Sequence, residues 1–169
     1  VCDPYQPLEE RYALTRRSLE VLAGRDFPVV IQTKSARVRR DLDVIRRIAG
    51  VEVGFTIATE DDTIARMFEP GASPVGERVE VLREFKVAGV ATYAFAGPLL
   101  PGNPERLAAL LVGAVDRVLI DRMNYLPAVK VFYSRHGLED ALTDAFFRTQ
   151  STRLAKALRA RGIIVEKVF

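Results

Sequence analysis

The 169-residue sequence is poor in the residues that build disulfides and metal sites, with one cysteine, Cys2, and one histidine, His136. A single cysteine excludes a disulfide framework and a multi-cysteine metal site within this chain, and it favours a reducing, cytoplasmic location. A multi-histidine metal centre or a histidine-based triad would depend on His136 alone. We therefore expect no metal ligands in this chain and interpret His136 as an ordinary surface or loop residue.

Several other signals are missing. No run of about eighteen apolar residues occurs, so the sequence predicts no membrane-spanning helix and no membrane partner. The glycine-rich dinucleotide fingerprint, the phosphate-binding P-loop and the nucleophile elbow are absent too. The formal net charge is only +3, from 25 basic and 22 acidic side chains. That balance permits contact with phosphates without requiring it.

The sequence does contain a repeated strand–helix pattern, and its hydrophobic content of 49% is enough to fill a core. The clearest unit is 51–88: an apolar strand at 51–57, a polar loop around Glu69, and a helix. We expect that helix to have Ser73 as its N-cap and Pro74 as its first residue. Further strands are predicted at 29–31, 90–96, 118–120 and 163–165.

Helical patterns lie between these strands. One ends at Gly24, and its predicted buried stripe is Leu8, Tyr12, Leu19 and Leu22. Ser35 should cap a helix that runs to about 48, and Asn103 should cap another that begins at Pro104. The segment 125–137 is irregular in pattern, and 138–161 is helical with a predicted break near 149–152.

Strands that alternate with helices predict parallel pairing, because the helix supplies the crossover that parallel neighbours need. We expect one α/β domain over 1–169, with no linker dividing it. Four or five such units are too few to close an eight-stranded barrel. The pattern therefore leaves two architectures open, an open parallel sheet or the arc of a partial barrel.

Polar residues follow several of the predicted strands, where ligands bind in such folds. Lys34, beside Gln32, could meet a carboxylate or phosphate, or could form a structural ion pair with an acid such as Asp3. Thr56 could hydrogen-bond a ligand or could simply be a good strand former. Glu69 could bind a ligand amine or could only hold its loop.

Five motifs occur in order along the first two thirds of the chain: Asp3-Pro4-Tyr5-Gln6-Pro7, Gln32-Thr33-Lys34-Ser35, Gly54-Phe55-Thr56-Ile57, Phe68-Glu69-Pro70-Gly71-Ala72-Ser73-Pro74 with Arg78 and Glu80, and Gly97-Pro98 with Leu100-Pro101-Gly102. As an ordered set they resemble the radical S-adenosylmethionine enzymes of the spore photoproduct lyase type. The resemblance implies an incomplete (βα) barrel of parallel strands with helices outside, a partial TIM-barrel arc. It also implies a [4Fe–4S] cluster and S-adenosylmethionine, whose reductive cleavage yields a radical that abstracts hydrogen from the substrate.

The resemblance also implies roles for individual residues. Lys34 and Thr56 fall where the family contacts the methionyl end or ribose of the cofactor, and the Gly97-Pro98 strand end falls where backbone groups meet the adenine. Asp3 and Gln32, in the matching motifs, are assigned to the same cofactor site. Cys2 lies close to the hydrogen-donating cysteine of the lyase branch, with an offset of one or two residues.

The three clustered cysteines that hold the family's cluster have no counterpart here. We therefore expect the chain to be the carboxyl-terminal portion of a larger enzyme, inactive by itself and without bound cofactor, whose substrate is damaged DNA or a small molecule. Such a fragment should self-associate through the strand at 29–31 or through barrel-interior faces near Phe55 and Phe95. The alternative is a non-redox βα domain that binds a small anionic ligand or a partner protein at its strand ends.

Overall fold

The computed structural model describes residues 2–124 and 126–168. Its strands form one five-stranded sheet in the order β1-β2-β3-β4-β5, and every neighbouring pair is parallel. The strands are β1 (Val30–Thr33), β2 (Glu52–Thr56), β3 (Ala91–Ala96), β4 (Arg117–Ile120) and β5 (Ile164–Lys167). Spatial order thus follows chain order, as expected when each crossover is a helix on the same side.

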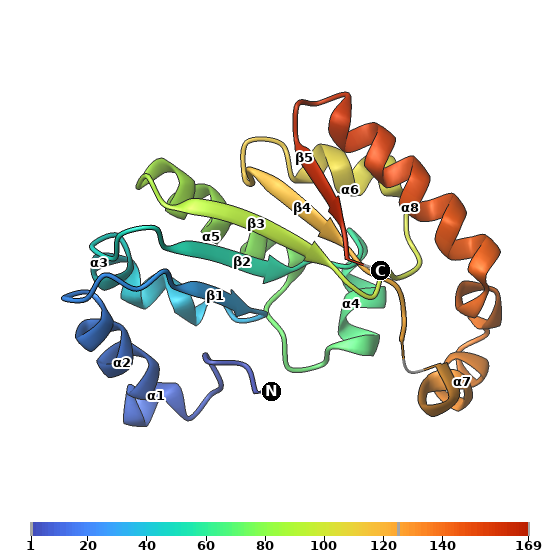
Figure 1. The fold of residues 1–169 in the computed structure, drawn as a ribbon. Coiled ribbons are helices and arrows are strands. Elements are labelled where there is room, and N and C mark those ends of the chain that lie inside the picture. Colours follow the sequence, from blue (N-terminus) through green and yellow to red (C-terminus); the bar gives the residue numbers. More distant parts are fainter. Residues whose placement is uncertain (1, 125, 169) are drawn as a thin grey trace.

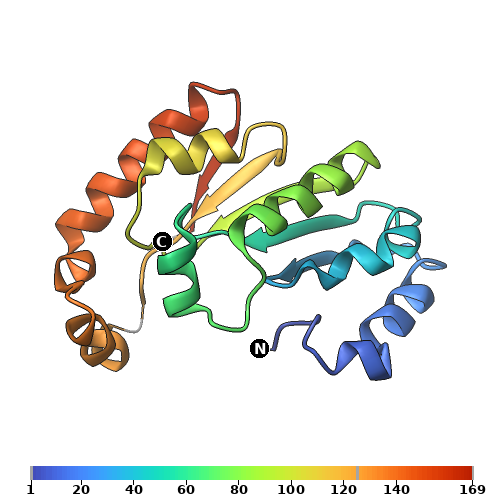
Figure 2. The ribbon, with the colours of Figure 1, turned by 180° about the vertical axis from the view of Figure 1, so that it is seen from behind.

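The helices lie on one face of the sheet and leave the other face open (Figures 1 and 2). In chain order they are α1 (Glu9–Tyr12), α2 (Leu14–Leu22), the 3-10 segment η1 (Ala36–Asp41), α3 (Leu42–Ile45), α4 (Asp62–Phe68), α5 (Val75–Val87), α6 (Pro104–Leu110), α7 (Leu126–Arg135), η2 (Glu139–Leu142) and α8 (Asp144–Arg159). Figure 2 shows α3, α5 and α6 in front of the sheet, and α8 beside α6 at the β5 edge. A twisted parallel sheet with helices on its outer face confirms the predicted partial barrel.

The strand register separates a covered face from an open one. Val53 and Phe55 of β2 and Ala94 of β3 are fully buried against the helices. The residues between them, such as Gly54, point to the open side, where Gly54 pairs in register with Tyr93. Phe55 therefore lies in the core, and its predicted place on the barrel-interior face is wrong.

The amino-terminal helix differs from its prediction. It is divided at Ala13, which has a left-handed φ of 47°, into α1 and α2. Leu19 is buried, but Leu8 is 63% exposed and Tyr12 is 49% exposed. The predicted buried stripe is thus wrong for its first turns, because the break at Ala13 shifts the helical face.

The loop after β2 contains a helix that the sequence pattern did not predict. The Asp61 carboxylate accepts hydrogen bonds from the N–H groups of Thr63 and Ile64 and so begins α4. At the next helix, the N-cap position belongs to Pro74, which offers no side-chain cap. The predicted capping role of Ser73 is wrong, since its hydroxyl accepts a hydrogen bond from the Ala36 N–H instead.

Two caps were predicted correctly, while the carboxyl-terminal third differs in detail. The Asn103 side chain caps α6, and the Ser35 hydroxyl accepts a hydrogen bond from Arg37 N–H at the start of η1. Residues 126–135, expected to be irregular, form α7, and α8 runs without the predicted break. Within the described residues, no helix is both long and apolar enough to cross a membrane.

Candidate functional site at the strand ends

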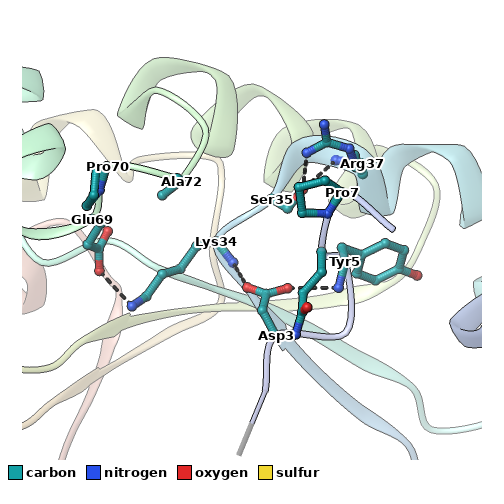
Figure 3. Close-up of a pocket in the computed structure, with 11 residues that line it drawn as sticks. Asp3, Tyr5, Pro7, Lys34, Ser35, Arg37, Glu69, Pro70 and Ala72 are labelled. Atoms are coloured by element: carbon teal, nitrogen blue, oxygen red, sulfur yellow. Dashed lines mark hydrogen bonds and ion pairs between the residues drawn. The ribbon is translucent and has the colours of Figure 1, made fainter. Parts of the chain in front are cut away.

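The carboxyl end of β1 carries an ion pair on the side chain of Lys34. The Lys34 ammonium lies 3.0 Å from a Glu69 carboxylate oxygen, and Figure 3 shows the two side chains pointing at each other. The Lys34 side chain is 44% exposed and that of Glu69 only 11%. The structural ion pair expected for Lys34 therefore exists, but its acid is Glu69 and not Asp3.

Asp3 fastens the amino-terminal segment to this strand end. One carboxylate oxygen accepts hydrogen bonds from the Tyr5 N–H (2.8 Å) and the Thr33 hydroxyl (2.7 Å), and the other accepts from the Lys34 N–H (2.8 Å). Three hydrogen-bond donors thus occupy the Asp3 carboxylate. Two of them belong to consecutive residues, Thr33 at the end of β1 and Lys34 directly after it. Asp3 therefore binds the backbone of Lys34, whereas the Lys34 ammonium pairs with Glu69.

Behind Glu69 lies a buried arginine. Arg78, on α5, is 2% exposed, and its guanidinium donates to the second Glu69 carboxylate oxygen at 2.7 Å. It also donates to the backbone carbonyls of Thr56 (2.8 Å) and Ser73 (2.6 Å). A buried guanidinium needs such partners, because an unpaired charge in the interior is strongly unfavourable.

A cavity of about 240 Å³ opens beside this group of charges. Its walls come from the amino-terminal segment, the end of β1 and the loop after α4 (Figure 3). The charged residues that line it are Asp3, Lys34, Arg37 and Glu69. Sites for whole small molecules usually measure about 300–1,000 Å³, so this cavity suits the end group of a larger ligand.

Gln32 and Thr56 lie side by side on the open face, one on β1 and one at the end of β2. The Gln32 amide donates to the Thr56 hydroxyl at 3.5 Å and accepts from the Tyr93 hydroxyl at 3.1 Å. Burial raises the pKa of Tyr93 to about 12, with a further contribution from Glu52. Tyr93 therefore stays a neutral donor at ordinary pH, and Gln32 is held in place between two hydroxyl groups.

Ion pairs cover the open face of the sheet next to Tyr93, toward the amino-terminal ends of the strands. Arg117 donates to both carboxylate oxygens of Glu52, at 2.8 and 2.6 Å, and pairs with Glu166 at 3.1 Å. Its guanidinium carbon also lies 5.1 Å from the Tyr93 ring centroid. These groups leave Gln32 exposed in the carboxyl-terminal half of the face, while Thr56 beside it is only 4% exposed.

Gly97 and Pro98 follow β3 directly, at the same edge of the sheet, and the peptide bond between them is cis. A side chain at position 97 would meet the Phe95 ring at 2.5 Å and the Asp121 Cβ at 2.8 Å. Beyond them, Leu99 N–H donates to the Asp121 carbonyl at 3.2 Å. Backbone groups of this turn are therefore presented next to the end of β4, where a larger residue than Gly97 would not fit.

Neither Cys2 nor His136 lines the cavity beside Lys34 and Glu69. Cys2 is exposed and lines a second cavity, of about 560 Å³, whose apolar wall includes Leu8, Tyr12 and Leu14. His136 is exposed, as expected for a surface residue, and its ring lies 4.6 Å from that of Phe132. In the described part of the chain, no three His, Cys, Asp or Glu side chains gather as metal ligands.

Arg78, Tyr93 and Arg117 were not predicted from the sequence as site residues. Arg78 appeared there only as part of a motif, and an arginine on a helix ordinarily lies at the surface. A polar ring at position 93, in an apolar strand, was a signal that could have marked Tyr93. Arg117 precedes the predicted strand at 118–120, and only the sheet register places it beside Tyr93.

No protein-family model matches this chain. An uncharacterized protein of Methanocaldococcus jannaschii is 33% identical over 101 residues, which cover 60% of this chain and 39% of that protein. One from Acidianus two-tailed virus is 34% identical over 105 residues (62% and 34%), and one from Mycobacterium tuberculosis is 33% identical over 102 residues (59% and 30%). The matches thus span little more than a third of the relatives' length, or less.

Solved structures of spore photoproduct lyase have a similar fold. The lyase complexed with dinucleoside spore photoproduct gives a TM-score of 0.68 at 16% identity, over 95% of this chain and 57% of that one. A double mutant of the lyase with bound AdoMet and dinucleoside spore photoproduct gives 0.66 at 16% identity, over 94% and 56%. At such identity the likeness establishes the shared fold, an arc of parallel strands with helices outside.

Proposed function

We propose that this chain is the carboxyl-terminal portion of a radical S-adenosylmethionine enzyme that resembles spore photoproduct lyase. The observation that carries the proposal is the Lys34 ammonium at the end of β1, partly exposed beside a cavity sized for an end group. It lies in a fold like that of a lyase solved with bound AdoMet. In this proposal Lys34 binds the carboxylate of the methionyl end, and Thr56 and Gln32 face the ribose.

Other residues of the motif set complete the proposed cofactor site. The backbone at Gly97 and Pro98 would meet the adenine, while Asp3 holds the Lys34 backbone in place through its hydrogen bond to the Lys34 N–H. Cys2 is proposed as a hydrogen donor near the substrate, since it is exposed and adjacent to the Asp3 anchor. S-Adenosylmethionine would supply the radical chemistry, and the substrate would be damaged DNA or a small molecule.

The residues of this chain do not fit an iron–sulfur cluster, which needs three or four thiolates. Cys2 is the chain's one cysteine, and no metal-ligand group occurs within 2–124 or 126–168. We therefore propose that the cluster ligands belong to the rest of the parent protein, meaning the product of the complete reading frame. The chain alone is then expected to be inactive.

The complete reading frame tests this assignment. Under the proposal, the sequence upstream of residue 1 contains a Cys-x3-Cys-x2-Cys pattern. Its absence would favour the second candidate, a non-redox βα domain that binds a small anionic ligand at its strand ends. That candidate is favoured by the partly exposed Lys34 ammonium, which lines a cavity that needs no cluster to bind an anion.

Binding measurements on the parent protein test the role of Lys34. Lys34→Ala is expected to weaken S-adenosylmethionine binding by about 1–3 kcal/mol, the range for a hydrogen bond to a charged group. Isothermal titration calorimetry of the two proteins measures the difference. Arg39→Ala, which removes an exposed cation paired with Glu84, serves as the control. Unchanged affinity in Lys34→Ala would return Lys34 to a purely structural role.

A further inference from the structure

Arg78 is the largest fully buried side chain of the described residues, and it lies directly behind the proposed cofactor site. Its guanidinium donates to Glu69, to the Thr56 carbonyl at the end of β2, and to the Ser73 carbonyl before α5. The Ser73 N–H in turn donates to the Lys34 carbonyl at 3.0 Å. One buried side chain therefore fixes the relative positions of two strand ends and of the loop that carries Glu69.

Glu69 transmits this fixed position to Lys34. One carboxylate oxygen accepts from Arg78 at 2.7 Å, and the other contacts the Lys34 ammonium at 3.0 Å. Both oxygens are thus occupied, and the carboxylate is 11% exposed. An ammonium has three donors, so Lys34, at 44% exposure, keeps donors for a ligand after binding Glu69.

The charges decide what that ligand can be. Among the charged residues that line the cavity, Lys34 and Arg37 balance Asp3 and Glu69. Glu10 pairs with Arg37 at 2.6 Å, and Arg78 pairs with Glu69 from behind, so these six charges sum to zero. Without the buried Arg78 cation the same group would be net negative and would repel an anion. Exposed surface charges are screened by salt, whereas a buried one is screened much less.

We propose that Arg78 and Glu69 are positioning residues that hold the Lys34 ammonium and make the end of β1 selective for a carboxylate. This inference rests on the proposed function, because it assigns the carboxylate to the amino-acid end of S-adenosylmethionine. Arg78 touches no ligand itself. It acts through Glu69, and its positive charge offsets the carboxylate that would otherwise repel the incoming anion.

The test compares two probes on the parent protein. S-Adenosylhomocysteine has the amino-acid carboxylate, and 5′-methylthioadenosine lacks it but keeps the adenosine. Arg78→Met is expected to weaken binding of S-adenosylhomocysteine at least tenfold and to change binding of 5′-methylthioadenosine less than twofold. Arg78→Lys, which keeps the charge, should retain most of the preference for the carboxylate. Arg83→Met, on the same helix but exposed, is the matched control.

Each outcome has a distinct meaning. If Arg78→Met loses affinity for both probes equally, or for neither, the positioning role is wrong while the proposed function stands. If the unmodified parent protein binds neither probe, the proposed function itself fails. Should Arg78→Met not fold, Arg78→Gln removes the same charge and keeps a donor for the Thr56 carbonyl. A preference for the carboxylate that survives in Arg78→Gln would overturn the inference.

Discussion

Gly54 is the residue at which the packing of the open face can be tested most sharply. A Cβ at this position would clash with the tip of the Tyr93 ring. Gly54→Ala should therefore displace the ring and its hydrogen bond to Gln32, and destabilise the fold by about 1–3 kcal/mol. Urea unfolding followed by circular dichroism measures the change.

Gly76→Ala is the matched control for this substitution. Position 76 lies in α5, and a Cβ there meets nothing within 4 Å. It should stabilise the protein by about 0.4–1 kcal/mol, because alanine loses less backbone freedom on folding. Equal effects of the two substitutions would show that the Tyr93 ring does not lie over Gly54.

At the scale of elements, strand positions were predictable from the sequence, but several helices were not. The predicted strands were short apolar runs, and the run around Val53 is conspicuous because β2 is buried on both faces after Glu52. The seven residues of α4 mix polar and apolar types and so favour a loop by pattern, although Asp61 is a capping signal. The burial of Arg78 could not be predicted from the sequence, because it depends on how α5 packs on β2.

α7 depends on a small aromatic cluster for its attachment to α4. The Phe68 ring lies 5.1 Å from that of Phe132 and 5.0 Å from that of Tyr133, both in edge-on arrangements. Phe132→Ala should remove this contact and destabilise α7 by about 1–3 kcal/mol, less than for a fully buried ring. Hydrogen exchange should accelerate in 126–142 and stay unchanged in β1 to β4.

Val131→Ala provides the comparison on the same helix. Val131 is 61% exposed, so its truncation should leave exchange in α7 nearly unchanged. If Phe132→Ala instead unfolds the whole chain at once, α7 is an integral part of the core and not a separately attached element.

At the scale of the whole molecule, the amino-terminal side of the sheet has the features of an interface. β1 is an edge strand, and large apolar side chains with more than 60% exposure gather in the first thirty residues: Leu8, Leu14, Val21, Phe27 and Val30. Exposed edges and apolar patches promote association. We therefore expect the isolated chain to self-associate, and light scattering over a dilution series measures its mass.

Val30→Lys should weaken that association, because a charged side chain on an edge strand opposes pairing with another strand. Val87→Lys is the control, since Val87 is 90% exposed at the end of α5, away from β1. A monodisperse monomer at high concentration would contradict the expectation that this edge needs a partner.

We propose that this chain forms the S-adenosylmethionine-binding part of a radical enzyme. The most direct measurement is the amount of 5′-deoxyadenosine that the parent protein forms from S-adenosylmethionine under anaerobic, reducing conditions. We expect formation by the parent protein, a large decrease in Lys34→Ala, and none by the isolated chain. A cluster-loaded parent protein that binds S-adenosylmethionine but forms no 5′-deoxyadenosine would contradict it.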